Sequence, residues 1–228
     1  AKNQIVVLAE QKTTRLCAIA HYSFTGLRGG KELIEGLNKV LHDHGLRPHA
    51  IGTFFVDMGP GSFTGIRSAM GVTTAMTTVT RQKTMGFPAA LPLLAACLDS
   101  IPGLQTQTCA VIFDGRRNEV LLETWTLGSD STFRRLSTPE AVSIESLATL
   151  KTGNILIRSD DPLLARTPPD QIATRSRLHV LDLHPEHYCR GISCALETCP
   201  ELLDPQLIPI YVRPPVFVEP RTIKPSPQ

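Results

Sequence analysis

Apolar and polar residues along the first hundred positions form blocks that predict strands and helices in turn. Short, wholly apolar runs are typical of buried strands, and apolar residues spaced three and four apart are typical of helices that bury one face. Gly45 stands where the C-terminal cap of a helix is expected. The predicted order is a strand at Ile5–Ala9, a turn at 10–14, a strand at Leu16–Ala20, a helix from Lys31, a strand at Ile51–Val56, and helices at Arg67–Thr80 and Ala89–Leu98.

The pattern starts again after residues 101–103. The predicted elements are strands at Thr108–Phe113 and Glu119–Trp125 around a turn at 114–118, a helix at Pro139–Leu150 with Thr138 as its N-cap, a strand at Asn154–Ile157 and an irregular stretch at 162–177. Because hairpin, helix and strand occur twice, the sequence predicts an α/β fold with two similar lobes. We expect an N-terminal lobe at 1–101, a second lobe at 102–213 whose last helix returns toward the first, and a mobile, proline-rich tail at 214–228.

Charge and hydropathy exclude several classes of protein. The 228 residues include 23 Lys and Arg against 21 Asp and Glu, a net charge of +2, so charge alone would not hold a nucleic acid. No apolar run approaches the roughly 18 residues that span a bilayer, and the first residues lack a signal peptide's apolar region. We therefore expect a cytoplasmic protein without a membrane contact.

A glycine-rich segment between a predicted strand and a predicted helix is the most specific feature of the chain. It runs from Asp57 to Arg67 and includes Gly59, Gly61, Ser62, Thr64 and Gly65. Loops of this kind at helix N-termini can hold a phosphate or carboxylate, but the lysine of a P-loop is missing. A structural turn and a ligand loop therefore both stay open.

The helix predicted after this loop has almost no charged residue between Arg67 and Arg81. A helix that is apolar or small on every side is buried on more than one side. It either lies in the centre of its own domain or is covered by another protein, and these two interpretations stay open.

Two other clusters have structural and functional interpretations. Asp114, Arg116 and Glu119 lie around a predicted hairpin turn, where turn geometry is favoured over a ligand site. Cys189, Cys194 and Cys199 are spaced five apart, which favours residues of a helix over a metal site because such positions diverge around the helix axis.

Four segments together resemble the TsaB family, also called YeaZ. They are Gly59–Arg67 (GPGSFTGIR), Gly86–Leu91, Phe113–Val120 and Ile210–Arg213, and they occur in family order across most of residues 1–213. The resemblance implies the fold of the actin-like ATPases (ASKHA), with two ribonuclease-H-like lobes. It also implies a non-catalytic scaffold subunit of the complex that adds threonylcarbamoyl to adenosine next to the tRNA anticodon.

The resemblance implies the partners as well. The chain would pair with a TsaD-like catalytic subunit and support a TsaE-like ATPase, would meet tRNA only indirectly, and would carry no cofactor or metal, since ATP and metal belong to the partner subunits. A homodimer stays open. The implied partner interface consists of Leu33, Leu37, Leu41, Phe63, Ile66, Met70, Thr73, Thr74 and Thr77, and the implied vestigial ligand site of Asp114, Arg116 and Glu119.

The first predicted turn departs from the family pattern. An acid that actin-like ATPases use for nucleotide is replaced by Gln11, beside Glu10 and Lys12, and this loss argues against nucleotide hydrolysis. The alternative function is a diverged small-molecule kinase or ATPase of the same fold.

Overall fold

The computed structural model describes residues 3–25, 29–101, 103–104, 107–128, 132–150, 152–173 and 175–212. They form a mixed α/β structure with one six-stranded sheet and two pairs of strands. The tail expected at 214–228 lies outside the described residues. Among the residues described, no helix has the length and apolar character needed to cross a membrane.

The chain begins with a long antiparallel hairpin. Strand β1 (Asn3–Lys12) pairs with β2 (Arg15–Thr25), so both strands are longer than predicted and only two residues form the turn. Helix α1 (Gly29–Asp43) packs across the hairpin, where a Cβ on Gly36 would lie 2.6 Å from the ring of Tyr22. The helix and both strands of this region are therefore confirmed.

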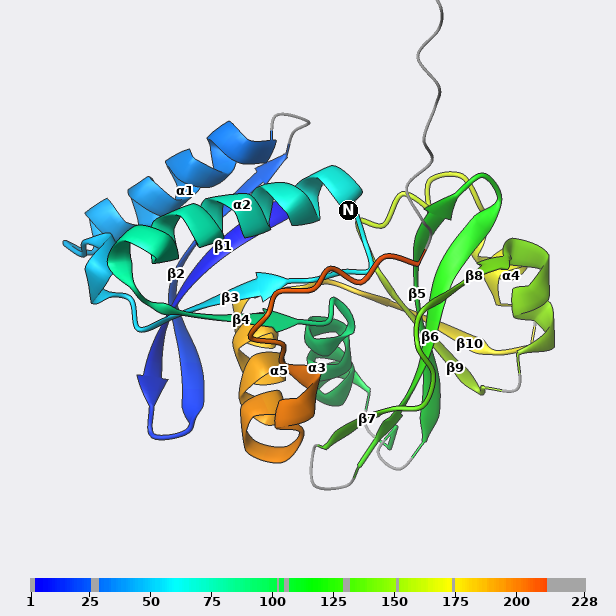
Figure 1. The fold of residues 1–228 in the computed structure, drawn as a ribbon. Helices are drawn as coiled ribbons and strands as arrows, with labels where there is room; N and C mark the ends of the chain where they lie inside the picture. Colours follow the sequence, from blue (N-terminus) through cyan, green and yellow to red (C-terminus); the bar gives the residue numbers. More distant parts are fainter. Residues whose placement is uncertain are drawn as a thin grey trace, which may run out of the picture.

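A parallel β-α-β unit follows. Strand β3 (Thr53–Asp57) and β4 (Lys83–Phe87) pair in parallel, and α2 (Phe63–Thr80) connects them. Helix α2 begins four residues earlier than predicted because Ser62 caps its N-terminus. Helix α3 (Ala90–Ser100) then follows β4. Figure 1 shows α1 and α2 side by side above the hairpin and the β3–β4 pair.

The six-stranded sheet holds the second half of the chain. Its order is β10-β9-β5-β6-β7, and β8 also pairs with β6. The strands are β5 (Thr108–Arg116), β6 (Glu119–Leu127), β7 (Phe133–Arg135), β8 (Glu140–Ser143), β9 (Asn154–Arg158) and β10 (Arg177–Leu181).

The helix predicted at Pro139–Leu150 is wrong. Residues 140–143 form β8, whose register places Glu140 opposite Leu122 and Ser143 opposite Glu119, and Ile144–Thr149 form a 3-10 helix. Residues 140–143 become a strand because they pair with β6, and the apolar pattern of the segment itself does not show that this partner is near. Hairpin, helix and strand therefore do not repeat in the way predicted, and the two similar lobes stay a prediction.

The largest core lies between the six-stranded sheet and two helices. Helix α5 (Pro185–Thr198) packs on α3 so closely that a Cβ on Gly191 would lie 2.7 Å from the carbonyl oxygen of Leu91. Helix α5 also reaches the hairpin, where the backbone N–H of Leu16 donates to Ser193 Oγ at 2.8 Å. A short helix α4 (Pro169–Ile172) and 3-10 turns at Pro48–Ala50 and Pro200–Leu202 complete the elements of the described chain.

One charged side chain is fully enclosed in this core. Glu123 on β6 is 0% exposed, and Arg135 Nε lies 3.3 Å from its carboxylate. Neither carboxyl oxygen has a well-aligned hydrogen bond, and Arg135 also stacks over the ring of Trp125. Burial raises the pKa of Glu123 to about 7, because a carboxylate is poorly solvated there and Arg135 offsets this only in part.

Glu123 predicts a pH dependence of folding. An acid whose pKa is higher in the folded than in the unfolded state binds its proton more tightly when folded, so stability falls as pH rises from about 4.5 to about 7. This group alone lowers the free energy of unfolding by up to about 3 kcal/mol across that interval. Urea unfolding of wild type and Glu123→Gln at several pH values measures it. An equal slope in both proteins would contradict the assignment.

Candidate functional site

The glycine loop turns the chain from the end of β3 into α2. The side chain of Asp57 accepts a hydrogen bond from the backbone N–H of Gly59 at 2.8 Å, and Ser62 Oγ accepts one from the N–H of Gly65 at 3.3 Å. Burial raises the pKa of Asp57, and the bond from Gly59 opposes this shift. Gly59 has a φ of +92°, which other residues rarely adopt. The loop is therefore a tightly held turn.

The C-terminal strap, which we define as residues 203–212, lies across this loop. The N–H of Ile210 donates to the carbonyl of Met58 at 2.9 Å, and Asp204 and Gly86 exchange two backbone hydrogen bonds of 2.9 and 2.7 Å. Leu207 packs with Val56 and Met58. The strap thus holds together the start of the glycine loop at Met58 and the end of β4 at Gly86. Figure 1 shows it running between the β3–β4 pair and the large sheet.

Aromatic and cationic side chains meet where the strap crosses the N-terminus of α2. The rings of Phe63 and Tyr211 lie 5.1 Å apart, and the guanidinium of Arg67 lies 4.8 Å from the centre of the Phe63 ring. Phe63 is 44% and Tyr211 41% exposed. Exposed aromatic and arginine side chains that are already ordered are favourable contact points for another protein, because little entropy is lost on binding.

The structure corrects the expected partner interface on α2. Ile66 and Thr73 are each 7% exposed, and Met70 packs with Val56 and Met58, so this row of the helix faces its own protein. Thr77 lies on the same row and is half-buried. The row one step around the helix faces solvent instead, and its exposed members are Phe63, Arg67, Gly71, Thr74, Ala75, Thr78 and Val79.

On α1, the structure contradicts the expected interface only at Leu41, and the assignment of Leu33 and Leu37 stays a prediction. Leu41 is only 6% exposed, and Leu33 and Leu37 are half-buried within the chain. The solvent side of α1 is charged and forms exposed ion pairs between Lys31 and Glu35 and between Lys39 and Asp43, at 3.5 and 2.8 Å. The exposed side of α1 therefore carries more charge than that of α2, although Ile34 on α1 is 47% exposed.

The exposed face of α2 is less polar than its sequence suggests. Thr77 Oγ1 donates to the carbonyl of Thr73 at 3.0 Å, Thr78 Oγ1 to that of Thr74 at 2.7 Å and Thr80 Oγ1 to that of Met76 at 2.7 Å. These hydroxyl donors are satisfied by the helix backbone, and of the three only Thr78 lies on the exposed face, whereas Thr77 and Thr80 are half-buried beside it. Val79 is 82% exposed beside them. This uncharged face costs little to remove from water.

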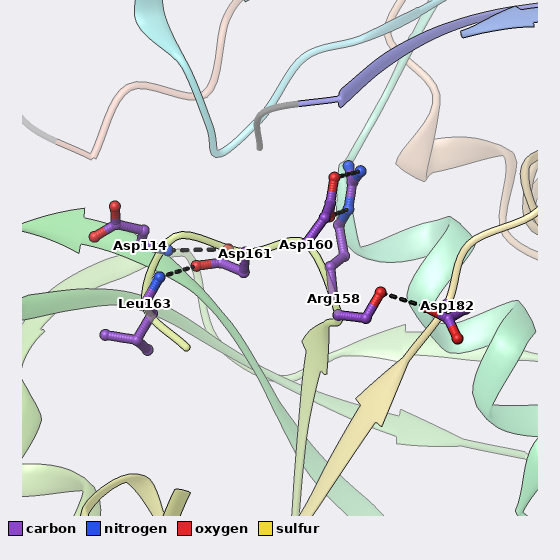
Figure 2. A network of polar contacts seen from close by, with 7 residues as sticks. Asp114, Arg158, Asp160, Asp161, Leu163 and Asp182 are labelled. Carbon is purple, nitrogen blue, oxygen red and sulfur yellow. Dashed lines mark hydrogen bonds and ion pairs between the residues drawn. The ribbon is translucent and has the colours of Figure 1, made fainter. Parts of the chain in front are cut away.

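Asp114 lies near the end of β5, at the bulge before the two-residue turn at Arg117 and Asn118. Asp114 accepts a hydrogen bond from the N–H of Arg116 at 2.8 Å and forms an ion pair with Arg166. The backbone N–H of Asp114 donates to Asp161, as Figure 2 shows. Arg116, with Arg117 and Asn118, has a positive φ. The Asp114 side chain is therefore engaged by groups on both sides of it, the N–H of Arg116 and the guanidinium of Arg166.

A polar network beside this turn was missed by the sequence analysis. Arg158 donates two hydrogen bonds of 2.9 Å to Asp160, and Asp161 accepts from the N–H of Leu163 at 2.9 Å (Figure 2). Ser159 bonds to Asp182. The signal was present, since polar residues directly after the buried parallel strand β9 mark its carboxyl end. Among the described residues, no three His, Cys, Asp or Glu side chains are grouped to hold a metal ion.

Gln11 lies at the exposed end of β1, beside the two-residue turn at Thr13 and Thr14. Gln11 Nε2 donates to the carbonyl of Thr13 at 3.2 Å, and Lys12 lies 3.5 Å from Glu10. The polar groups at this end of the hairpin thus contact one another.

The glycine loop predicts a contrast between its two glycines. A Cβ at Gly59 would lie 2.8 Å from Ile66 Cδ1 and would force a side chain into φ +92°, so Gly59→Ala should lower the free energy of unfolding by about 1–3 kcal/mol. A Cβ at Gly61 meets nothing within 4 Å, so Gly61→Ala is the matched control and should change stability little. Urea denaturation measures both, and equal losses would contradict the loop's described geometry.

Comparison with known proteins shows the fold and leaves the family open. No protein-family model and no curated protein sequence matches the chain. Among the solved structures that are similar, two each have a TM-score of 0.66 and 18% identity. One is described as an uncharacterized protein with similarity to peptidase YeaZ from Pseudomonas aeruginosa and covers 93% of this chain and 95% of its own. The other, YeaZ from Pseudomonas aeruginosa, covers 92% and 94%. The chain therefore has the fold of these YeaZ structures over nearly its whole length.

Proposed function

We propose that the chain is a member of the TsaB family and acts as a non-catalytic subunit of a tRNA threonylcarbamoyladenosine-forming complex. The likeness to YeaZ covers more than nine-tenths of both chains, and the glycine-loop motif that suggested the family is built into the structure as a strap-held turn. In this proposal the fold is actin-like, with two ribonuclease-H-like lobes.

The exposed face of α2 is the observation that carries the proposal. It extends from Phe63 to Val79 with Arg67 as its only charged side chain, and the hydroxyl of Thr78 on this face donates to the carbonyl of Thr74. Surfaces of this kind are favourable to bury against another protein because few polar groups lose water. We infer that a TsaD-like subunit covers this face, and that Phe63, Arg67 and Tyr211 form the centre of the contact.

The remaining roles follow from the same family proposal. The chain itself would transfer no group, and ATP, metal and tRNA would be bound by the partner subunits, with a TsaE-like ATPase joining the assembled pair. The Asp114 turn supports this division because its carboxylate is engaged by Arg166 and by the N–H of Arg116. In this proposal the complex is cytoplasmic, and the TsaD-like subunit carries out catalysis.

Introducing a charge on α2 tests the interface. Thr74→Lys places a charge in the middle of the uncharged face, and we expect it to weaken binding to a TsaD-like subunit at least about tenfold, roughly 1.4 kcal/mol. Leu136→Lys is the matched control, because Leu136 is 49% exposed and follows β7 in the other half of the molecule. Isothermal titration calorimetry measures both affinities. Equal affinities for wild type and Thr74→Lys would contradict the proposed interface.

A nucleotide titration separates the scaffold from the alternative kinase or ATPase. We expect no heat when ATP and magnesium are added to the isolated chain at millimolar concentration. Saturable binding of ATP that depends on magnesium would overturn the non-catalytic assignment and favour the alternative.

A further inference from the structure

The second half of the molecule contains a pocket that is separate from the α2 face. Its volume is about 430 Å³, which lies within the roughly 300–1,000 Å³ of small-molecule sites. Its walls come from the turn before β6, the 3-10 helix Ile144–Thr149 and the segment that leads into α4. In Figure 1 this region lies around α4, on the opposite side of the molecule from α1.

The base of the pocket rests on a buried core. Ile144 and Thr167 of its lining are each 6% exposed, and Ala148 is half-buried. Ile144 belongs to the same buried cluster as Leu147 and Ile172, and this cluster joins the 3-10 helix to α4. Because packed side chains hold both walls, the shape of the pocket does not depend on a ligand.

The rim of the pocket carries two opposite charges that do not pair with each other. Glu145 accepts a hydrogen bond from Asn118 Nδ2 at 2.6 Å, whereas Arg166 forms its ion pair with Asp114. Arg166 also lies 3.5 Å from the carbonyl oxygen of Glu119. Among the described residues, no ion pair joins Glu145 to Arg166. The pocket thus has an acidic end and a basic end.

Both charged groups keep atoms with which they can bind a ligand. The contacts of Arg166 within the described chain start from Nη2, so Nε and Nη1 remain as donors. A carboxylate can accept several hydrogen bonds, and Asn118 supplies one to Glu145. Hydrogen bonds from the backbone N–H of Glu145 itself and from Asn118 lower the pKa of this carboxyl, so it is ionised at neutral pH.

We propose that this pocket binds a free α-amino acid, with the ammonium group at Glu145 and the carboxylate at Arg166. A zwitterion carries both charges on one small molecule, so a single ligand can pair with both ends of the pocket. The side-chain carbonyl of Asn118 would accept a further N–H from the ammonium, and the amide of Gln171 would donate to the carboxylate. A ligand with only one of these charges leaves the other end unpaired, which makes the site selective.

The base of the pocket favours an aliphatic side chain on this amino acid. Ile144 and Ala148 offer apolar side-chain atoms to a ligand. A charged side chain would lose water against them without gaining a partner, whereas an aliphatic one would remove apolar surface from water. An amino acid such as leucine is therefore the appropriate probe.

The amino-acid site goes beyond the proposed function and does not depend on it. The residues that line the pocket belong to segments between Asn118 and Gln171, whereas the proposed partner surface consists of α2 and Tyr211 of the strap. Binding of an amino acid and binding of a TsaD-like subunit are therefore measured separately, and each result stands without the other.

An NMR titration of the ¹⁵N-labelled full chain tests the site with L-leucine and two of its analogues. L-Leucinamide lacks the carboxylate and N-acetyl-L-leucine lacks the ammonium group. We expect L-leucine to cause saturable shifts in the backbone amides of Glu145, Ala148, Thr167 and Gln171, while those of α2 stay unchanged. Each analogue should bind at least about tenfold more weakly, because it leaves one charge of the pocket unpaired.

A pair of variants separates the acidic end of the pocket from a general effect of charge. Glu145→Gln removes the charge but keeps an oxygen that can accept from Asn118, and it should weaken L-leucine binding at least about tenfold. Glu140→Gln removes the same charge from an exposed position on β8 outside the lining, so this matched control should keep the wild-type affinity. The dispersion of the amide signals verifies that both variants fold.

Several outcomes would overturn the proposal. One is the absence of saturable shifts at tens of millimolar L-leucine, and another is saturable shifts that lie away from the pocket. Equal affinity for L-leucine and either analogue would show that the two charges do not recognise a zwitterion. Unchanged binding in Glu145→Gln, or binding that is lost in Glu140→Gln, would remove the acidic end from the site.

Discussion

The backbone hydrogen bonds between the C-terminal strap and the glycine loop hold the candidate surface in place. Met58 and Gly86, at the ends of the two parallel strands of the first half, receive the strap through Ile210 and Asp204. The ends of β3 and β4 would otherwise leave these backbone groups without partners near a buried core. The same contacts bring Tyr211 against Phe63 and so order the aromatic group at the start of α2.

The uncharged face of α2 depends on a second effect, the bonding of threonine side chains to their own helix. A helix rich in threonine is a poor helix former, and its hydroxyl groups usually need water. In α2 several hydroxyls donate to carbonyls one turn back, at 2.7–3.0 Å, which removes that need. A surface that looks polar in the sequence thus becomes one that a protein partner can cover at low cost.

The sequence predicted the elements whose signals are local. The hairpin, α1 and the strand–loop–helix unit at Gly59 all follow from runs, spacing and turn residues close to one another in the chain. It failed at Pro139–Leu150 because pairing with β6, about twenty residues away, decides that segment. Periodicity also showed that α2 has no charged side. It could not show that the row of Ile66 and Thr73 is buried near Val56 and Met58 while the row of Thr74 is exposed to solvent. The ion pairs of Arg166 and Arg158 likewise depend on packing that spacing does not encode.

The central claim is that the exposed face of α2 binds a partner subunit. Hydrogen exchange of the full chain, with and without a TsaD-like protein at saturating concentration, addresses it most directly. The account predicts slower exchange in the first turns of α2 and at Tyr211, with the charged outer side of α1 unchanged. Protection that lies elsewhere on the chain, or that is absent altogether, would contradict it.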